Sequence, residues 1–475
     1  MSSSTASATG SNRGEDAPLW AIWLGFACLY ILSLGRGFYS SDGEVMFMTA
    51  AALAERGTFQ LTPDPALPQI VTGTDGAAYS KYDPGLPLLG VPFFVLGDRL
   101  GMVNNAHRYR LAATAALLIP ALSAAGALAA LAGLAGMLVS PRRAVGVALV
   151  AGLGTILWPY ARVLFAEATL ACALTLAVFA VWRAGNGGRR RWWIIAGAAF
   201  GWGIATRAAL AIYMLPLAML IARISAGEGR RVLIARLAVF SLGTAPGVAL
   251  VLWHNVLRFG EPFAFGYTGE SFTTAPWEGA FGLLFSPGKS VFVYAPPLAA
   301  SVLLWPRFRQ LQPALADFLA LAWLVALGFY GAWWAWHGGW SWGPRLLVPL
   351  VPLSCLPLAA LPDHRPWRWL AAALVVVGGG VQIAGVLTDA IPHYAALAGA
   401  GEAGYHALHY APGSSPLVAA TERILRGQTE PLAMFHLAGT GLPRTWTVGV
   451  PLTLLAGLGW SAWAIWRGVR AGFAQ

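Results

Sequence analysis

Two carboxylates, Asp42 and Glu44, follow the first apolar run of the chain, Pro18–Leu34. This run is a candidate membrane span, so the two acids lie where the membrane meets water. A carboxylate at such a place can serve as a general base toward a hydroxyl group. Asp42 lies nearer to the membrane end, between the small residues Ser41 and Gly43. We therefore predict Asp42 as the general base. Glu44 is a second catalytic candidate, with an ordinary solvated loop acid as the alternative.

Four cations from distant parts of the chain are candidate ligands for a phosphate group: Lys81, Arg207, Lys289 and Arg345. Cationic side chains form strong charge-assisted hydrogen bonds with phosphate oxygens. Three of them have an alternative reading. Lys81 could form a surface ion pair, Arg207 could extend toward the membrane interface, and Lys289 could anchor the chain at that interface.

Five further side chains are candidate substrate contacts: Tyr82, Arg162, Glu167, His337 and Trp340. Arg162 and Glu167 flank the start of an apolar run, where charges usually face a cavity or a partner, and a structural pair between them is the alternative. His337 and Trp340 belong to the segment 333–345, which contains five tryptophans. We predict that these rings stack on sugar faces. An aromatic belt at the membrane interface is the alternative.

The composition indicates a polytopic membrane protein. Of the 475 residues, 57% are hydrophobic and only 11% are charged, whereas soluble domains have about 25% charged residues. The net charge of +11 does not indicate nucleic-acid binding, because the basic residues form small clusters between apolar runs. The three cysteines all lie inside apolar runs, which predicts neither a disulfide framework nor a metal cluster.

An apolar run of about 20 residues can cross a membrane as a helix. The runs in this sequence predict an all-α bundle of about twelve membrane-spanning helices. The runs are Pro18–Leu34, Leu111–Val139, Ala144–Trp158, Val163–Trp182, Trp192–Ala205, Leu210–Ala222, Val232–Trp253, Val291–Leu304, Ala314–Trp333, Leu346–Leu361, Trp367–Leu387 and Val448–Trp466. Residues 1–17 are predicted to be a disordered cytoplasmic terminus, because they are rich in Ser, Ala and Gly. Residues 18–475 are predicted to form one transmembrane domain.

Basic residues predict the orientation of these spans, because Lys and Arg collect in cytoplasmic loops. With alternating spans, all the basic clusters between runs fall on the side of the N-terminus, which is then the cytoplasm. The outer side receives the segments 36–110, 254–290, 334–345 and 389–447. The apolar stretch Pro84–Leu100 would reverse every later cluster if it crossed the membrane. We therefore predict that it lies on the outer side as a helix or re-entrant turn.

These motifs resemble the polytopic GT-C glycosyltransferases, in particular protein O-mannosyltransferases and the aminoarabinose transferases of lipid A. The resemblance rests on Ser41–Glu44, Lys81–Gly85, Glu167 after Trp158–Tyr160, Asn255 with Phe259–Pro262, Phe285–Lys289 and Trp336–Arg345. The chain departs from the better-known enzymes in two ways. Gly43 stands where a second acid often follows the aspartate, and a large soluble C-terminal domain is lacking.

The resemblance implies a glycosyltransferase of the cell membrane, plasma or inner, that uses a polyprenyl-phosphate sugar as its donor. Transfer would occur on the extracytoplasmic face, with inversion, to a hydroxyl of a lipid, glycan or protein acceptor. Asp42 would be the base, and the four cations would neutralise the phosphate. This scheme requires no cofactor, although a divalent metal is compatible with it. The alternative class is a flippase or transporter of a lipid-linked glycan, which would need no general base.

Overall fold

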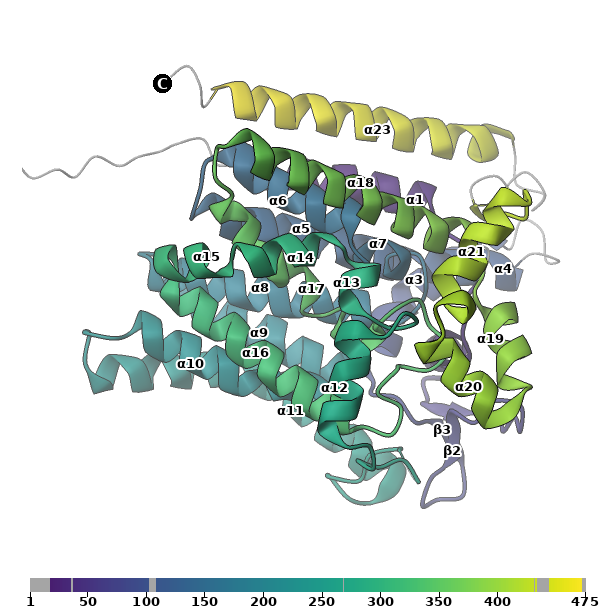
Figure 1. The fold of residues 1–475 in the computed structure, drawn as a ribbon. Helices are drawn as coiled ribbons and strands as arrows, with labels where there is room; N and C mark the ends of the chain where they lie inside the picture. The colour runs from purple at the N-terminus through teal and green to yellow at the C-terminus, as the bar shows by residue number, and fades with distance from the viewer. Residues whose placement is uncertain are drawn as a thin grey trace, which may run out of the picture.

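Long apolar helices, lying roughly side by side, make up most of the computed structural model (Figure 1). It describes residues 18–35, 37–101, 108–267, 269–430, 432–433 and 444–471, so the prediction for residues 1–17 lies outside it. The bundle contains α1 (Leu19–Leu32), α4 (Arg108–Ala116), α5 (Leu118–Gly136), α6 (Pro141–Gly154), α8 (Glu167–Gly185), α9 (Arg191–Thr206), α10 (Met214–Ile224), α11 (Arg230–Phe259), α16 (Pro313–Ala332), α18 (Arg365–Leu387) and α23 (Arg444–Ala471).

Six helical stretches of the described residues are long and apolar enough to cross a membrane. They are 108–136, which joins α4 and α5, together with α8, α11, α16, α18 and most of α23. The expected class, a helical multi-pass membrane protein, is thereby confirmed. The number of about twelve crossings stays a prediction.

Three predicted spans are not continuous helices. The run Ala144–Trp158 is interrupted at Thr155, between α6 and α7 (Leu157–Tyr160). The other two runs are interrupted at prolines. The run Val291–Leu304 divides into α13 (Val291–Tyr294) and α14 (Pro297–Leu303). The run Leu346–Leu361 divides into the turns η3 (Arg345–Leu347), α17 (Val351–Ser354) and η4 (Leu356–Ala360). Prolines explain the breaks in these two runs, because each lacks the N–H group that an α-helix needs and clashes with the preceding turn.

Small residues bring α9 and α11 into close contact. A Cβ atom added to Gly197 would lie 2.0 Å from the carbonyl oxygen of Phe240, and one added to Gly247 would lie 2.0 Å from that of Gly201. Glycines at such positions let two membrane helices approach through their backbones. This packing supports the end of α9, where Arg207 forms the C-terminal cap.

One end of the bundle carries the shorter elements (right in Figure 1). These are α2 (Ser41–Arg56), α3 (Gly85–Gly101), α12 (Pro276–Phe285), α19 (Ile391–Ala398), α20 (Gly401–Tyr410), η5 (Pro412–Ser414) and α21 (Pro416–Leu425). The predicted stretch Pro84–Leu100 is the single helix α3, which packs against α2 and α4. Its helical form is confirmed, and its place on the outer side of the membrane stays a prediction.

A small antiparallel sheet at the same end was not predicted. Its strands β1 (Gln60–Leu61), β2 (Ile70–Thr72) and β3 (Ala78–Ser80) pair in the order β1-β3-β2. Strands of two or three residues are too short to show an alternating pattern in the sequence. The sheet matters for the site because β3 ends directly before Lys81 and Tyr82.

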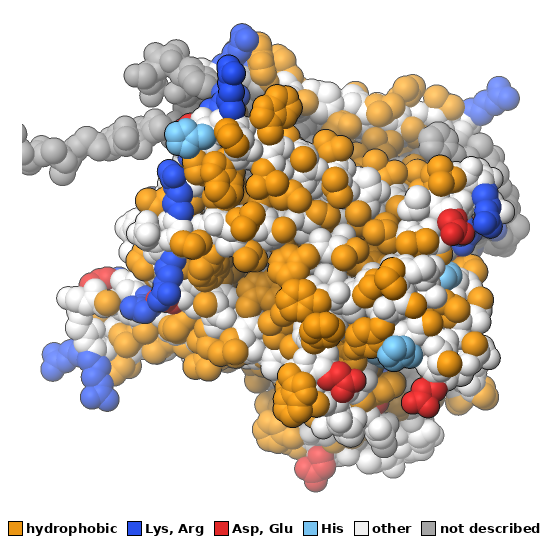
Figure 2. Space-filling view, in the orientation of Figure 1, with side chains coloured by type: hydrophobic (Ala, Val, Ile, Leu, Met, Phe, Trp, Pro, Cys, Tyr) orange, Lys and Arg blue, Asp and Glu red, His pale blue; other side chains and the backbone are white. Residues whose placement is uncertain are grey.

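Basic side chains gather at the other end of the bundle. Figure 2 shows Lys and Arg along the left edge of this face, where the α10–α11 and α15 (Trp305–Leu311)–α16 connections lie in Figure 1. The grouping agrees with the charge pattern of the sequence, in which basic clusters lie between alternate spans. We propose that this end faces the cytoplasm.

Single-cysteine labelling tests that orientation. We expect a membrane-impermeant maleimide to label Glu402→Cys in intact cells and to spare Asn186→Cys. Glu402 is exposed in α20, at the end with the short elements, whereas Asn186 is exposed in the basic connection between α8 and α9. Both variants should react after the cells are permeabilised, which controls for reactivity. Labelling of Asn186→Cys alone in intact cells would invert the assignment.

Candidate functional site

A cavity of about 1610 Å³ opens at the end of the bundle that carries the short elements. Eight predicted site residues line it: Asp42, Glu44, Lys81, Tyr82, Arg207, His337, Trp340 and Arg345. They come from α2, the segment after β3, the end of α9, the loop after α16 and the first residue of η3. Three predicted residues, Arg162, Glu167 and Lys289, lie behind this lining rather than in it.

Asp42 lies in the first turn of α2, not in an open loop. The sequence predicts a helix from Val45, but α2 begins at Ser41, and the Ser40 hydroxyl accepts a hydrogen bond of 3.1 Å from the amide of Gly43. Serine is a favoured N-terminal cap because it satisfies one of the free amides of the first turn. The positive end of the helix dipole stabilises a carboxylate placed there.

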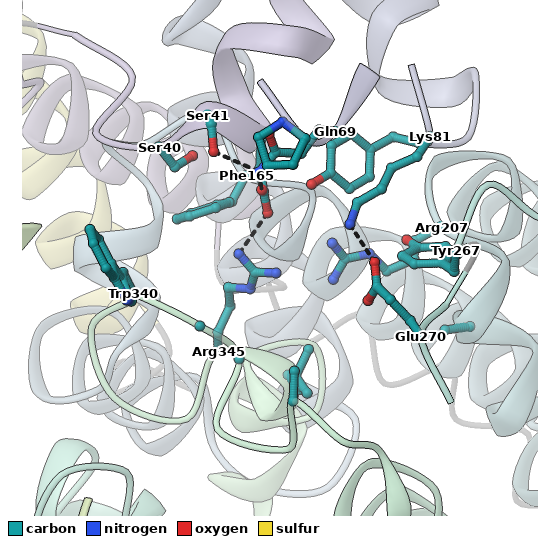
Figure 3. A pocket seen from close by; sticks show the side chains of 18 of the residues that line it. Ser40, Ser41, Gln69, Lys81, Phe165, Arg207, Tyr267, Glu270, Trp340 and Arg345 are labelled. Atoms are coloured by element: carbon teal, nitrogen blue, oxygen red, sulfur yellow. Dashed lines mark hydrogen bonds and ion pairs between the residues drawn. The ribbon is translucent and has the colours of Figure 1, made fainter. Parts of the chain in front are cut away.

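A chain of alternating charges runs from the cavity into the protein. One nitrogen of Arg345 donates to Asp42 at 2.8 Å, and its Nε lies 3.3 Å from the carboxylate of Glu167. Arg207 binds the same oxygen of Glu167 at 2.7 Å. Glu167 is buried, with 1% of its side chain exposed. Figure 3 shows both arginines pointing toward the middle of the cavity.

The alternative pairing of Arg162 with Glu167 is wrong within the described residues. Arg162 instead lies against Tyr39, with its guanidinium carbon 5.1 Å from the ring centre, and donates to the carbonyl of Gly385 at 3.3 Å. Arg162 thus packs beside the cavity lining. Glu167 is left to orient the two arginines that do face the cavity.

The pKa of Asp42 is lowered from its ordinary value. Burial raises the pKa, but the charge of Arg345, a hydrogen bond from the Tyr82 hydroxyl and the charge of Arg207 together outweigh that effect. The amide of Gln69 adds a contact of 3.3 Å to the same carboxylate. Asp42 is therefore ionised at neutral pH, the state a general base requires.

Lys81 has a partner that the sequence did not reveal. Its ammonium forms an ion pair of 2.6 Å with Glu270 and lies 5.2 Å from the centre of the Tyr267 ring. The other oxygen of Glu270 accepts a hydrogen bond of 3.2 Å from the indole of Trp334. Glu270 thus connects three segments at the cavity wall, and Figure 3 shows its pair with Lys81.

Lys289 does not reach the cavity. It is 1% exposed, and its ammonium donates to the carbonyl oxygens of Gly339 and Ser341 at 2.9 and 2.8 Å. The structure therefore places Lys289 inside the protein, against the loop that leads to Arg345. Neither predicted role, phosphate contact or interfacial anchor, corresponds to this position.

Aromatic and imidazole rings form another part of the lining. Trp340 is 38% exposed and lies nearly parallel to Tyr394, with ring centres 6.3 Å apart. The Nδ1 atom of His337 accepts a hydrogen bond of 3.0 Å from the amide of Gly339. Burial lowers the pKa of His337 well below its ordinary value, and the nearby charge of Lys289 adds to the effect. His337 is therefore neutral and contributes a flat polar ring.

Several lining residues escaped the sequence analysis. Phe165 supports Arg345, whose guanidinium carbon lies 4.7 Å from the centre of its ring. Gln69, Tyr267 and Glu270 lie in irregular segments without a charge pattern or periodicity. Phe165 could have been found, because it lies in the short segment between Arg162 and Glu167. Within the described part of the chain, no group of three His, Cys, Asp or Glu side chains is arranged to hold a metal ion.

Comparison with known proteins relates this architecture to solved membrane enzymes. No known family profile and no curated protein matches the chain by sequence. The crystal structure of ArnT from Cupriavidus metallidurans in the apo state is similar, with a TM-score of 0.53 and 17% identity over 95% of this chain and 75% of that chain. The same protein bound to undecaprenyl phosphate gives a TM-score of 0.49, with 17% identity over 95% and 74% of the two chains.

A more distant similarity extends to the archaeal oligosaccharyltransferase AglB from Archaeoglobus fulgidus, in complex with an inhibitory peptide and a dolichol-phosphate. Its TM-score is 0.43, with 13% identity over 93% of this chain and 56% of that chain. The fold assignment rests on the apo ArnT structure. The chain shares the fold of that structure, in agreement with the resemblance of its motifs to the aminoarabinose transferases.

Proposed function

We propose that this protein is an inverting glycosyltransferase that takes a sugar from a polyprenyl-phosphate donor and transfers it to a hydroxyl acceptor at the extracytoplasmic face. The observation that carries the proposal is the contact of 2.8 Å between Asp42 and Arg345 at the wall of a large cavity. It places an ionised acid beside a cation that can bind phosphate. General-base transfer with a phosphate leaving group uses an ionised base for the acceptor hydroxyl and a cation for the leaving phosphate.

The proposed reaction is a single displacement at the anomeric carbon. Asp42 accepts the proton of the acceptor hydroxyl while the acceptor oxygen forms its bond to that carbon. The bond between the anomeric carbon and the phosphate oxygen breaks, and the electron pair leaves with the lipid phosphate. Arg345, with Arg207 beside it, stabilises the negative charge that develops on the leaving group. The scheme requires no metal ion.

The position of the cavity supports a lipid-linked donor. A polyprenyl chain is apolar and stays in the bilayer, so its phosphate must be bound at a membrane interface. Arg207 caps the end of α9, and Arg345 lies close to it because both contact Glu167. The rings of Trp340 and His337 offer flat surfaces to the sugar or to a glycan acceptor. The candidate acceptors are hydroxyl groups of lipids, glycans and proteins.

A transfer assay tests the proposal against the flippase alternative. Purified protein in nanodiscs is given a radiolabelled polyprenyl-phosphate sugar and candidate acceptors, and the product is separated from the donor. Appearance of a glycosylated acceptor supports the proposal. The protein would instead be a flippase if the donor crosses proteoliposome membranes and its sugar–phosphate bond stays intact with every acceptor.

The pH dependence of transfer should follow Asp42. Because its pKa is lowered, the base is deprotonated above that value, so kcat/KM should stay level through neutral pH and fall only in acid. The fall should be centred below about 3.9, the ordinary pKa of aspartate. Arg345, Arg207 and Tyr82 are the charged or titratable groups that set this value. A midpoint near pH 6 would instead indicate a different titrating group.

A further inference from the structure

The ammonium group of Lys289 makes all of its hydrogen bonds to the loop 338–345. An ammonium has three N–H donors. Those of Lys289 meet the carbonyl of Gly339 at 2.9 Å, the carbonyl of Ser341 at 2.8 Å and the hydroxyl of Ser341 at 3.3 Å. No donor is left for a phosphate group. Among the described residues no carboxylate forms an ion pair with Lys289, so its hydrogen bonds to this loop are its main polar contacts.

The backbone of this loop depends on such support. Gly338 and Gly339 have φ angles of +73° and +72°, a region that side-chain-bearing residues avoid. Two consecutive glycines leave the unfolded chain with great conformational freedom, so the folded geometry has to be held by contacts from outside the loop. Lys289 comes from the turn between α12 and α13, about fifty residues earlier in the chain.

Two tyrosines hold the same loop from other directions. The hydroxyl of Tyr394 donates to the Ser341 carbonyl at 2.7 Å, and that of Tyr160 donates to the Trp342 carbonyl at 2.9 Å. The ring of Tyr394 also lies under the ammonium of Lys289, with its centre 5.1 Å away. The Ser341 carbonyl thus receives two donors, which fixes the backbone a few residues before Arg345.

We infer that Lys289 is a positioning residue: it holds the loop 338–345 so that the guanidinium of Arg345 reaches Asp42. Arg345 is the last residue of this loop, so a change in the loop backbone moves its guanidinium, which contacts Asp42 at 2.8 Å. Without the three hydrogen bonds, the Gly338–Gly339 segment relaxes, and Arg345 loses its fixed distance to the acid. The inference rests on the proposed function only for its kinetic consequences, since the loop geometry can be measured without a substrate.

Hydrogen–deuterium exchange of the detergent-purified protein tests the geometry. In Lys289→Met, which keeps the length of the side chain and removes its donors, we expect the backbone amides of residues 338–343 and 345 to exchange about 10- to 100-fold faster, from the loss of several buried hydrogen bonds. Ser415→Ala is the matched control. The Ser415 hydroxyl donates at 2.9 Å to the backbone carbonyl of Pro287, which lies in the same turn as Lys289. It does not contact the loop 338–345, so exchange in that loop should not change.

Kinetics with a polyprenyl-phosphate sugar test the link to Arg345. A residue that acts only by positioning Arg345 should give an effect that is not additive with Arg345→Ala. Lys289→Met should raise the donor KM and lower kcat together, whereas loss of folded protein lowers kcat alone. In the Arg345→Ala background, the same substitution should change both by less than about 3-fold. Additive losses would overturn the inference and indicate a direct phosphate contact.

Tyr394→Phe keeps the inference testable if Lys289→Met does not fold. This variant removes only the hydroxyl that donates to Ser341, and exchange in residues 338–345 should again increase. Unchanged exchange in the folded variants would contradict the positioning role. Should the transfer assay fail for every acceptor while exchange changes as expected, the proposed function fails and the structural role of Lys289 stands.

Discussion

Replacement of Asp42 by asparagine is expected to reduce sugar transfer by about 10²- to 10⁴-fold, the usual range for the loss of a general base. Asparagine keeps the shape of the side chain but cannot accept the proton of the acceptor hydroxyl. Donor binding should not weaken, because the phosphate is held by cations and the substitution removes a carboxylate that competes for Arg345. The measurement compares steady-state transfer with equilibrium binding of the donor by the same purified protein.

Asp64→Asn serves as the control for this experiment. Asp64 belongs to the same segment, 36–110, but is exposed, and its carboxylate accepts a hydrogen bond of 2.9 Å from the amide of Ala66. Transfer by this variant should match that of the unmodified protein. Near-normal turnover by Asp42→Asn would end the general-base assignment and remove the main reason to prefer a transferase over a flippase.

Replacement of Arg345 by alanine should weaken donor binding as well as turnover. Hydrogen bonds to charged groups contribute about 1.5–3 kcal/mol, which corresponds to roughly 10- to 100-fold in donor affinity. The charge of Arg345 also lowers the pKa of Asp42, so its removal should raise that pKa and move the acid limb of the pH profile to higher pH. Direct binding of a polyprenyl-phosphate sugar and the pH dependence of kcat/KM measure the two effects.

Arg143→Ala is the matched control for the loss of a cation. Arg143 forms an ion pair of 2.6 Å with Asp363 at the basic end of the bundle, away from the cavity, so neither donor affinity nor the acid limb should change. Arg345→Lys should retain part of the donor affinity, because lysine keeps the positive charge but cannot form bidentate hydrogen bonds with the phosphate. An unchanged donor affinity in Arg345→Ala would assign the phosphate to another cation.

The sequence predicted the location of the site better than its internal contacts. Asp42 and Arg345 were assigned to one face from membrane topology, and the structure places their side chains in contact. Charge patterns determine which end of a helix bundle a residue occupies, but they do not determine which acid meets which cation. Glu167 therefore pairs with Arg207 and Arg345 rather than with its neighbour Arg162.

The sequence also does not predict how deeply each cation is buried in the protein. Lys289 and Lys81 both lie beside apolar runs and look equivalent in sequence, yet one is buried under a loop and the other faces the cavity. The difference depends on the path of the loop 338–345, which tertiary contacts from distant helices determine. The helical class is predictable from apolar length, and the prolines in 291–304 and 346–361 indicate where these two runs break.

Asp42, Arg345, Glu167 and Arg207 form one series of ion pairs. It contains two carboxylates and two guanidinium groups, so its net charge is zero. Lys81 is likewise matched by Glu270. At Arg345, Arg207 and Lys81, an incoming phosphate therefore has to compete with carboxylates that already form ion pairs with these cations. Donor affinity is then the difference between two sets of ion pairs. It should respond to added salt much less than the number of cations around the cavity suggests.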